Sequence, residues 1–381
     1  PDVVDSQQCA LGQYSINRRT ALLLAAAAVG ASFGRWTPPT HAAPAGKLEI
    51  LSWDGFTLEK ENQAWREKNG IDQRSTLITN QDDVTIKLAS GGLVRIDATV
   101  CANGYEEIYR DLGVLTELDM KRIPNYNKDD IFAPFYQQAP GYFDGKQWVV
   151  PYCWGFDTIV QRPDIVGAEI TSLEDLLRPE FNGKLTIVDN PMAAWPQFAK
   201  ISGYGDKYPN MTKSEVLETF KNMEPYKRQC RVFASTNGDA ISLFAAGEIA
   251  ACFNGWTAIP IMTARQNITT KLILPKEGPS VYTDAWFIPT VSENTEAAHE
   301  FINQALTPEA QASLCDTAMS CTVHRKAPAL MNPETRALFD YDNFDDAFRL
   351  LKIYGQPPRS SEEFATFDDW LAAWTDFRAG F

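Results

Sequence analysis

The chain has 381 residues, of which 44% are hydrophobic and 22% are charged, as in a soluble globular protein with room for two domains. Its 49 acidic residues outnumber 35 basic ones, which gives a net charge of −14 at pH 7. This charge argues against a nucleic-acid partner, because phosphates bind Lys and Arg. With only three histidines, a His-based triad or multi-His metal site is nearly excluded, and we expect no cofactor.

Residues 1–43 are predicted to be an export signal peptide. Two adjacent arginines, Arg18 and Arg19, precede a short apolar run of Ala and Leu. That run has about half of the length needed to span a bilayer, and small residues follow it. We place cleavage at Ala42 or Ala43. The arginine pair resembles a twin-arginine signal, with a Sec signal as the alternative, and either route leads to the periplasm.

If the protein is exported, its cysteines can form disulfides. Six remain beyond the signal peptide, and an even number in an oxidising compartment permits disulfides. The candidate pairs are Cys315–Cys321, Cys230–Cys252 and Cys101–Cys153. No C-x-x-C motif occurs, which disfavours zinc and thioredoxin-like sites.

Strands and helices alternate through the first third of the mature chain. The expected strands lie at 47–53, 75–79 and 96–100, and the expected helices at 57–68, 82–89 and 105–111. This alternation predicts an α/β fold with a mainly parallel sheet flanked by helices. Ligands of such sheets bind beyond the carboxyl ends of the strands, where Trp53-Asp54 and Ala102-Asn103 lie.

A crossover between two lobes is predicted at 147–156, where Pro151 interrupts two apolar strand pieces. Further strands and helices follow it. The strands are expected at 184–189, 249–253 and 271–275, and the helices at 171–177, 214–223, 238–246, 295–306, from 307 onward, and at 364–381.

The stretch 279–289 places Tyr282, Asp284 and Trp286 in alternation. Alternate residues of an extended strand point to one face. A carboxylate beside two aromatic rings predicts a site for a small cation, through charge and cation–π attraction. The alternative is that both rings belong to the core and that Asp284 caps a nearby group.

Six segments in this order resemble the spermidine/putrescine-binding branch of the periplasmic solute-binding proteins of ABC importers. They are 53–56, 150–155, 171–189, 253–255, 275–278 and 279–289. The resemblance implies a two-lobed, type II-like periplasmic binding protein whose ligand cleft closes by hinge bending. It implies that 44–151 plus 286–321 form the first lobe and 152–285 plus 322–381 the second. An inner-membrane ABC permease is the implied partner, and we expect a monomer.

The family's ligand site carries over only in part. Tyr282 and Asp284 match its aromatic-x-Asp amine site, Trp53 matches its aromatic corner, and Phe253 replaces a tryptophan. Two acids that the family has after the strand ending at Asp189 are missing here. A desolvated ammonium without a partner loses about a hundredfold or more in affinity, which disfavours a long polyamine. The expected ligand-binding residues are Trp53, Asp54, Phe56, Asn103, Asn190, Phe253, Trp256, Tyr282 and Asp284.

These residues predict a receptor for a ligand with one positive end, such as a small amine, a γ-amino acid, a betaine or an aminophosphonate. Asn103 and Asn190 would bind its far end. One alternative is a receptor of the same fold for iron or an anion, although Tyr105 and Tyr282 do not form the adjacent pair that iron favours. The other is an exported enzyme, which the lack of G-x-S-x-G and H-E-x-x-H motifs disfavours.

Overall fold

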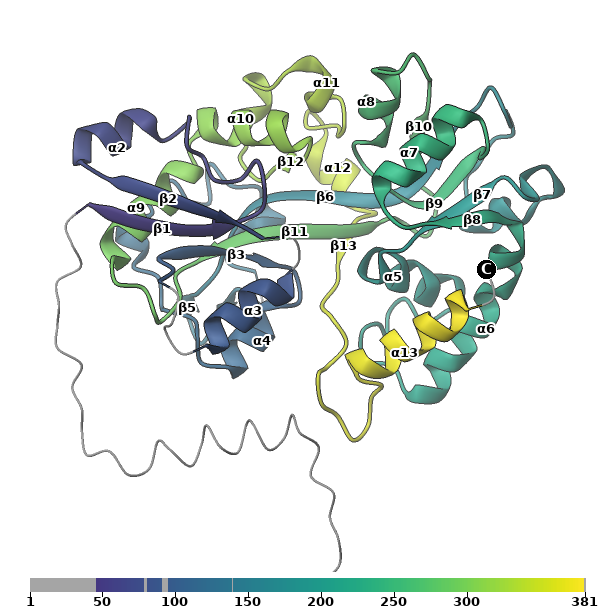
Figure 1. Ribbon diagram of the computed structural model, residues 1–381, viewed down its shortest axis with the longest axis horizontal. Coiled ribbons are helices and arrows are strands. Elements are labelled where there is room, and N and C mark those ends of the chain that lie inside the picture. Colours follow the sequence, from purple (N-terminus) through teal and green to yellow (C-terminus); the bar gives the residue numbers. More distant parts are fainter. Residues whose placement is uncertain (1–45, 79–80, 91–94, 139, 380–381) are drawn as a thin grey trace, which may run out of the picture. The chain divides into compact units, whose positions relative to one another are not determined.

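The computed structural model describes residues 46–78, 81–90, 95–138 and 140–379, and the predicted signal peptide lies outside these ranges. Most of the described strands form one mixed sheet in the order β2-β1-β3-β11-β6-β9-β7-β8 (Figure 1). The strands are β1 (Lys47–Ser52), β2 (Asp72–Leu77), β3 (Ala98–Ala102), β4 (Tyr142–Phe143), β5 (Lys146–Gln147), β6 (Val150–Gln161), β7 (Leu185–Val188), β8 (Cys230–Ala234), β9 (Ala251–Trp256), β10 (Lys271–Ile273), β11 (Ser280–Phe287), β12 (Cys321–Thr322) and β13 (Lys352–Ile353).

Helices flank this sheet. The α-helices are α2 (Gln63–Asn69), α3 (Gln81–Ala89), α4 (Glu106–Asp111), α5 (Pro191–Ile201), α6 (Lys213–Gln229), α7 (Asn237–Ala246), α8 (Ile259–Ala264), α9 (Thr295–Ala305), α10 (Pro308–Ala318), α11 (Pro333–Arg336), α12 (Phe344–Phe348) and α13 (Phe367–Arg378). Short 3-10 helices lie at Met120–Arg122, Ala133–Phe135, Leu173–Leu177, Pro179–Phe181 and Ala327–Ala329.

Two parallel halves of the sheet are joined by an antiparallel centre. β1 pairs in parallel with β2 and β3, and β7 pairs in parallel with β8 and β9. Between them, β11 runs antiparallel to both β3 and β6, and β6 runs antiparallel to β9. The long strands β6 and β11 cross from one half to the other (Figure 1). The predicted α/β class is confirmed, and the stretch 279–289 forms the expected crossing strand.

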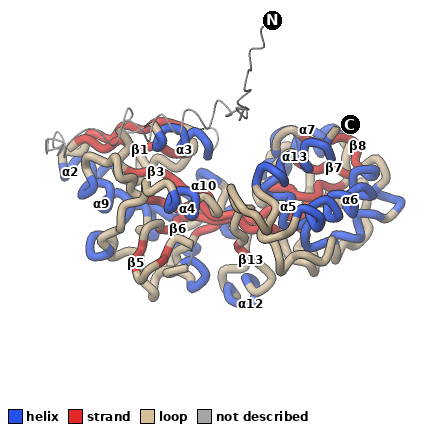
Figure 2. Tube along the Cα trace, turned by 90° about the horizontal axis from the view of Figure 1, so that it is seen from below, coloured by secondary structure: helices blue, strands red, loops and turns tan. Residues whose placement is uncertain are grey.

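Separate apolar cores lie at the two ends of the crossing strands. The first contains Trp286 against Phe301 of α9, with ring centroids 5.0 Å apart. The second is built on Trp195 of α5 and on Trp370 and Trp374 of α13. Figure 2 shows α5, α6 and α13 grouped around β7 and β8, apart from the helices around β1 and β3. Each group of elements therefore has its own hydrophobic interior.

The segment after β12 packs differently from the expectation. Phe339, Phe344 and Phe348 surround Trp154 in the first core, with ring centroids 4.8, 6.2 and 5.2 Å from the indole. The second core gains buried side chains only from Tyr354 onward. Of the range 322–381, the part 322–351 therefore belongs with the first core, because its aromatic rings pack around a tryptophan of β6.

Pro151 does not interrupt the crossover as expected, since β6 is one continuous strand of 12 residues. The register between β6 and β11 shifts between Asp284 and Ala285, which pair with Cys153 and Pro151. Tyr152 is the extra residue of this β-bulge. A proline has no N–H to donate, and a bulge is one of the few places where a sheet tolerates it.

Two of the expected helices differ from the prediction in where they begin or in their type. The helix expected from Thr57 begins at Gln63, because 57–62 form turns and Leu58 adopts a left-handed φ of 56°. The helix expected at 171–177 is a 3-10 helix over Leu173–Leu177, and Ser172 and Asp175 form a capping box at its start.

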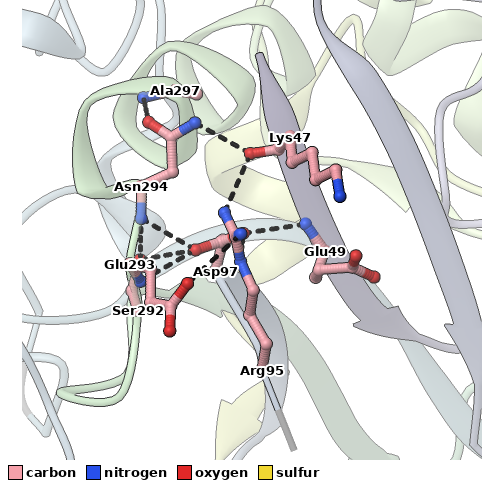
Figure 3. Close-up of polar contacts among 8 residues, drawn as sticks. All are labelled: Lys47, Glu49, Arg95, Asp97, Ser292, Glu293, Asn294 and Ala297. Atoms are coloured by element: carbon pink, nitrogen blue, oxygen red, sulfur yellow. Dashed lines mark hydrogen bonds and ion pairs between the residues drawn. The ribbon is translucent and has the colours of Figure 1, made fainter. Parts of the chain in front are cut away.

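A buried carboxylate ties the first strands to the chain that returns from β11 (Figure 3). Asp97 is fully buried, and its Oδ1 accepts hydrogen bonds from Ser292 Oγ and from the backbone N–H groups of Glu293 and Asn294, at 2.9–3.0 Å. Its Oδ2 accepts from the backbone of Glu49 at 2.9 Å and from Arg95 Nε at 3.2 Å. Three segments distant in sequence thus meet on one side chain.

Replacing this carboxylate should destabilise the first lobe. Asp97→Ala leaves three backbone N–H groups and the Arg95 guanidinium without their acceptor, so we expect a loss of about 3–5 kcal/mol in the free energy of unfolding. Urea denaturation followed by circular dichroism measures it. Asp54→Ala, in an exposed turn, should change stability by about 0.5 kcal/mol or less. An Asp97→Ala variant as stable as the wild type would contradict this role.

The cysteines are not bridged. Cys101, Cys153, Cys230, Cys252, Cys315 and Cys321 are all free thiols in the described part of the chain. The three expected disulfides are therefore wrong. Each of these thiols is buried, and burial raises the pKa of Cys315 and Cys321, which keeps them in the unreactive thiol form.

A reductant should consequently leave the stability of the protein unchanged. Dithiothreitol removes only bonds that the structure does not contain, so we expect the thermal midpoint to stay within about 1 °C in either redox state. Differential scanning fluorimetry with and without the reductant tests this. A drop of several degrees would show that a disulfide of about 2–4 kcal/mol exists in the exported protein.

Candidate functional site

A cavity of about 470 Å³ opens where the crossing strands meet the carboxyl ends of β3, β7 and β9. It is lined by Ala102, Asn103, Asp157, Asn190, Met192, Ala193, Thr236, Asn237, Gly238, Trp256, Ser280, Val281 and Tyr282. These residues come from the end of β3, on the side of the first core, and from the elements around the second core. A molecule in this cavity would contact both, as a hinge-closing receptor requires.

One face of the crossing strands carries most of the predicted chemistry. In the antiparallel register, Asp284 lies opposite Cys153, and Tyr282 lies opposite Gly155. Directly opposed residues share a face, and so do alternate residues of each strand. The same face therefore continues to Asp157, which pairs with Ser280 on one side and Trp256 on the other.

Tyr282 and Trp256 form an aromatic wall in the middle of this face. The indole Nε1 of Trp256 donates to the Tyr282 hydroxyl at 2.9 Å, so both ring planes are fixed. The phenol lies over Gly155, where any side chain would overlap its hydroxyl group. Burial raises the pKa of Tyr282 well above its ordinary value, and Asp157 adds to the shift. The tyrosine therefore acts as a neutral ring.

Asp284 is not among the residues that line this cavity, but it lies on the same strand face as Tyr282 and contacts Trp53. Its Oδ1 accepts a hydrogen bond from Trp53 Nε1 at 3.0 Å, and the Cys153 thiol lies 3.9 Å from Oδ2. The side chain is 9% exposed, and it pairs across the sheet with Ala102, which lines the cavity. Burial raises the pKa of Asp284 to about 6, partly offset by the bonds from Trp53 and Cys153. The structure thus brings the predicted Trp53 and Asp284 together.

Asp157 is the cavity residue that the sequence analysis missed. It is 6% exposed, and burial alone raises its pKa to about 7, with no cationic group contributing. The signal was present, because Asp157 is the one charged residue of the 12-residue strand β6. A lone carboxylate inside an otherwise apolar crossing strand needs a functional or structural reason.

Five of the nine expected ligand-binding residues are not among those that line the cavity: Trp53, Asp54, Phe56, Phe253 and Asp284. Phe253 is fully buried, with its ring 5.6 Å from Phe198 and 5.7 Å from Tyr226 in the second core, so its expected role as a cleft wall is wrong. Phe56 packs edge-on against Tyr152 at 5.3 Å. Asp54 is exposed in the turn after β1 and is not a cavity residue.

Asn103 and Asn190 line the cavity, but their side chains already have partners. Asn103 Oδ1 accepts from the Thr283 backbone at 3.0 Å, and its Nδ2 donates to the Tyr354 carbonyl at 2.9 Å. Asn190 caps α5, accepting from the Ala193 N–H at 3.4 Å. Their first task is therefore to fix the backbone at two edges of the cavity.

Two buried carboxylates stand beside aromatic rings, and neither pKa shift includes a contribution from Lys or Arg. Among the described residues, no cluster of three or more His, Cys, Asp or Glu side chains could hold a metal ion. Within the same ranges, no helix is long and apolar enough to cross a bilayer.

The buried acids should make the stability of the unliganded protein fall as pH rises from 5 to 8. Asp284, Asp157 and Glu106 have folded pKa values of about 6, 7 and 7, against about 4 in the unfolded chain. In this window the unfolded state has released protons that the folded state still holds, so each raised pKa contributes stability that is lost as pH rises. Thermal midpoints from pH 5 to 8 measure the slope.

Asp157→Asn should flatten this slope and should be at least as stable as the wild type at pH 8, because it removes a buried charge. An equally steep slope in the variant would show that Asp157 stays ionised across the window.

Comparison with known proteins gives one consistent family. Residues 79–334 match the family of bacterial extracellular solute-binding proteins. The spermidine/putrescine-binding periplasmic protein of Escherichia coli is 24% identical over 296 residues, which cover 77% of this chain and 82% of that protein.

Solved structures share the fold. The spermidine/putrescine transporter substrate-binding protein PotD of Streptococcus pneumoniae superposes with a TM-score of 0.72 at 18% identity, covering 87% of this chain and 99% of that one. The Atu4243–GABA receptor superposes with a TM-score of 0.62 at 17% identity, covering 87% and 95%. The predicted two-lobed periplasmic binding protein fold is confirmed by these likenesses.

Proposed function

Because the chain belongs to the family of bacterial extracellular solute-binding proteins, we propose that it is the periplasmic receptor of an ABC importer for a small amine. It would capture the ligand between its lobes and deliver it to an inner-membrane permease. The relatives are binding proteins and not enzymes, which supports a role without catalysis. We further propose that the receptor acts as a monomer and that the arginine pair directs export through the twin-arginine pathway.

The observation that carries this proposal is the charge of the cleft. Asp284 and Asp157 are buried beside the Trp256–Tyr282 wall, and no cation of the chain lowers either pKa. A buried carboxylate without a cationic partner is costly. A ligand ammonium would remove this cost, because it supplies the opposite charge and N–H donors, while the ring faces attract it by cation–π interaction.

The names of related proteins agree with this chemistry. Those relatives and neighbours are described as binding spermidine, putrescine or GABA, all of which carry at least one ammonium group. An iron or anion receptor, the alternative left open by the sequence, would need ligands that the cleft does not offer. No Arg or Lys is among the residues that line the cavity, whereas Asp157 is, so an anion would meet a carboxylate and no cation.

A thermal-shift screen tests the proposal on the mature protein, from about residue 44. The compounds are putrescine, spermidine, γ-aminobutyrate, choline, glycine betaine and 2-aminoethylphosphonate. A ligand at a hundred times its dissociation constant stabilises the protein by about 2.7 kcal/mol, a shift of several degrees. We expect at least one amine to produce this shift and Asp284→Asn to remove it.

Glu106→Gln is the matched control. Glu106 is also buried with a pKa raised to about 7, but it accepts a bond from the Gly104 N–H and lines a different cavity. It should leave the ligand-induced shift intact. A screen in which none of the amines moves the midpoint, or in which both variants keep the full shift, would refute an amine site at Asp284.

A further inference from the structure

Asp157 differs from the other buried acids of this chain in having no partner. Asp97 accepts five hydrogen bonds, Glu106 accepts one from a backbone N–H, and Asp284 accepts one from an indole and a long one from the Cys153 thiol. No hydrogen bond or ion pair to the Asp157 carboxylate exists within the described residues, although 94% of the residue is buried. Only 6% of the surface of Asp157 is exposed. Its carboxylate faces a cavity that is large enough for a small molecule.

The surroundings of Asp157 would favour a cation. Trp256 and Ser280 flank it across the sheet, and the Trp256 indole is held by its bond to Tyr282. Burial is the one cause of its raised pKa, so no Lys or Arg of the chain neutralises it. An aromatic ring beside an unpaired carboxylate is the arrangement in which a desolvated ammonium is bound most strongly.

We propose that Asp157 is a second ammonium-binding residue, so that the ligand places one cationic group at Asp284 and another at Asp157. This inference rests on the amine site proposed above and deepens it. The two acids share one face of the β6–β11 pair, with Tyr282 between them. Asp157, on the crossing strand β6, would then take the role of the two family acids that are missing after Asp189.

The strand geometry sets the length of such a ligand. The partner of Asp284 on β6 is Cys153, four positions before Asp157. Four residues of strand span about 13 Å, and a charge-assisted hydrogen bond takes up about 3 Å at each end. The two ammonium nitrogens would then be about 7 Å apart, the reach of a short linear diamine such as 1,4-diaminobutane. The sequence predicted a ligand with one positive end. On this proposal, the other end of the ligand also carries a positive charge.

Isothermal titration at pH 8.5, where both acids are ionised, tests the second site with three probes. They are 1,4-diaminobutane, 1-aminobutane and 4-aminobutanoate, which share a carbon chain and differ in the group at the far end. The wild type should bind the diamine about a hundredfold or more tightly than the monoamine, because only the diamine pairs with Asp157. The carboxylate of 4-aminobutanoate should be repelled.

Asp157→Asn should weaken 1,4-diaminobutane about a hundredfold, leave 1-aminobutane within about threefold, and improve 4-aminobutanoate, since the repulsion is gone. A general loss of structure would weaken the binding of all three compounds, so it cannot change the order of their affinities in this way. Glu106→Gln should leave all three affinities unchanged, and Asp284→Asn should weaken every amine.

Two results would overturn the proposal and are distinguishable. If the wild type binds 1-aminobutane as tightly as the diamine, or if Asp157→Asn keeps the wild-type preference, Asp157 is not a ligand residue and the amine receptor stands with a single ammonium site. If no amine binds the wild type at all, both the second site and the proposed function fall.

Discussion

The antiparallel pairing of β6 with β11 is the constraint on which the rest of this structure depends. This ladder has seven residue pairs, from Ser280–Asp157 at the cavity to Trp286–Val150 in the first core. β6 contributes buried side chains to both cores, whereas those of β11 lie in the first core. A shift in their register would move Trp286 out of the first core and Asp157 out of the cavity together. Packing and binding chemistry are therefore specified by the same pairing.

The bulge at Tyr152, next to Pro151 in β6, divides this pairing into two parts. On one side of it, β11 places Trp286 against Phe301 in a dry core. On the other side, the same face carries Asp284 and then Tyr282, which lines the cavity. An extra residue in one strand re-aims the side chains that follow, and bulges are common beside functional sites for this reason. Here it separates the structural end of the strand from the binding end.

Burying a carboxylate without a cationic partner destabilises the folded protein, and the buried acids of this fold differ in how far hydrogen bonds offset that cost. Asp97 is compensated by backbone and side-chain donors, which makes it a structural tie between segments. Asp284 and Asp157 are compensated little or not at all, so the unliganded protein holds them with raised pKa values. Functional sites often keep such local instability, because a ligand that relieves it gains affinity from the relief.

The sequence predicted the elements and the crossing strand well, because their signals are local. Alternation placed Tyr282 and Asp284 on one face, and Trp53 was expected at the carboxyl end of β1. Asp157 was missed because a polar residue after an apolar run looked like the end of a strand, whereas β6 continues to Gln161.

The other wrong predictions concern which side of the sheet or which core a side chain packs against, and local sequence patterns do not determine this. Phe253 is fully buried three residues before the end of β9, so the strand's phase turns it toward Phe198 rather than the cavity. The aromatic residues of 339–348 could have covered either core, and only the position of Trp154 decides between them.

Both hydrophobic cores need segments that are synthesised late. The first core is complete only after the segment that contributes Phe344 and Leu351, and the second only after α13, whose Trp374 and Phe377 close it. Neither lobe can bury its interior while the chain is still emerging from the ribosome in order, since domains fold as units once their segments are present. Each core therefore lacks its closing side chains until these late segments have been synthesised.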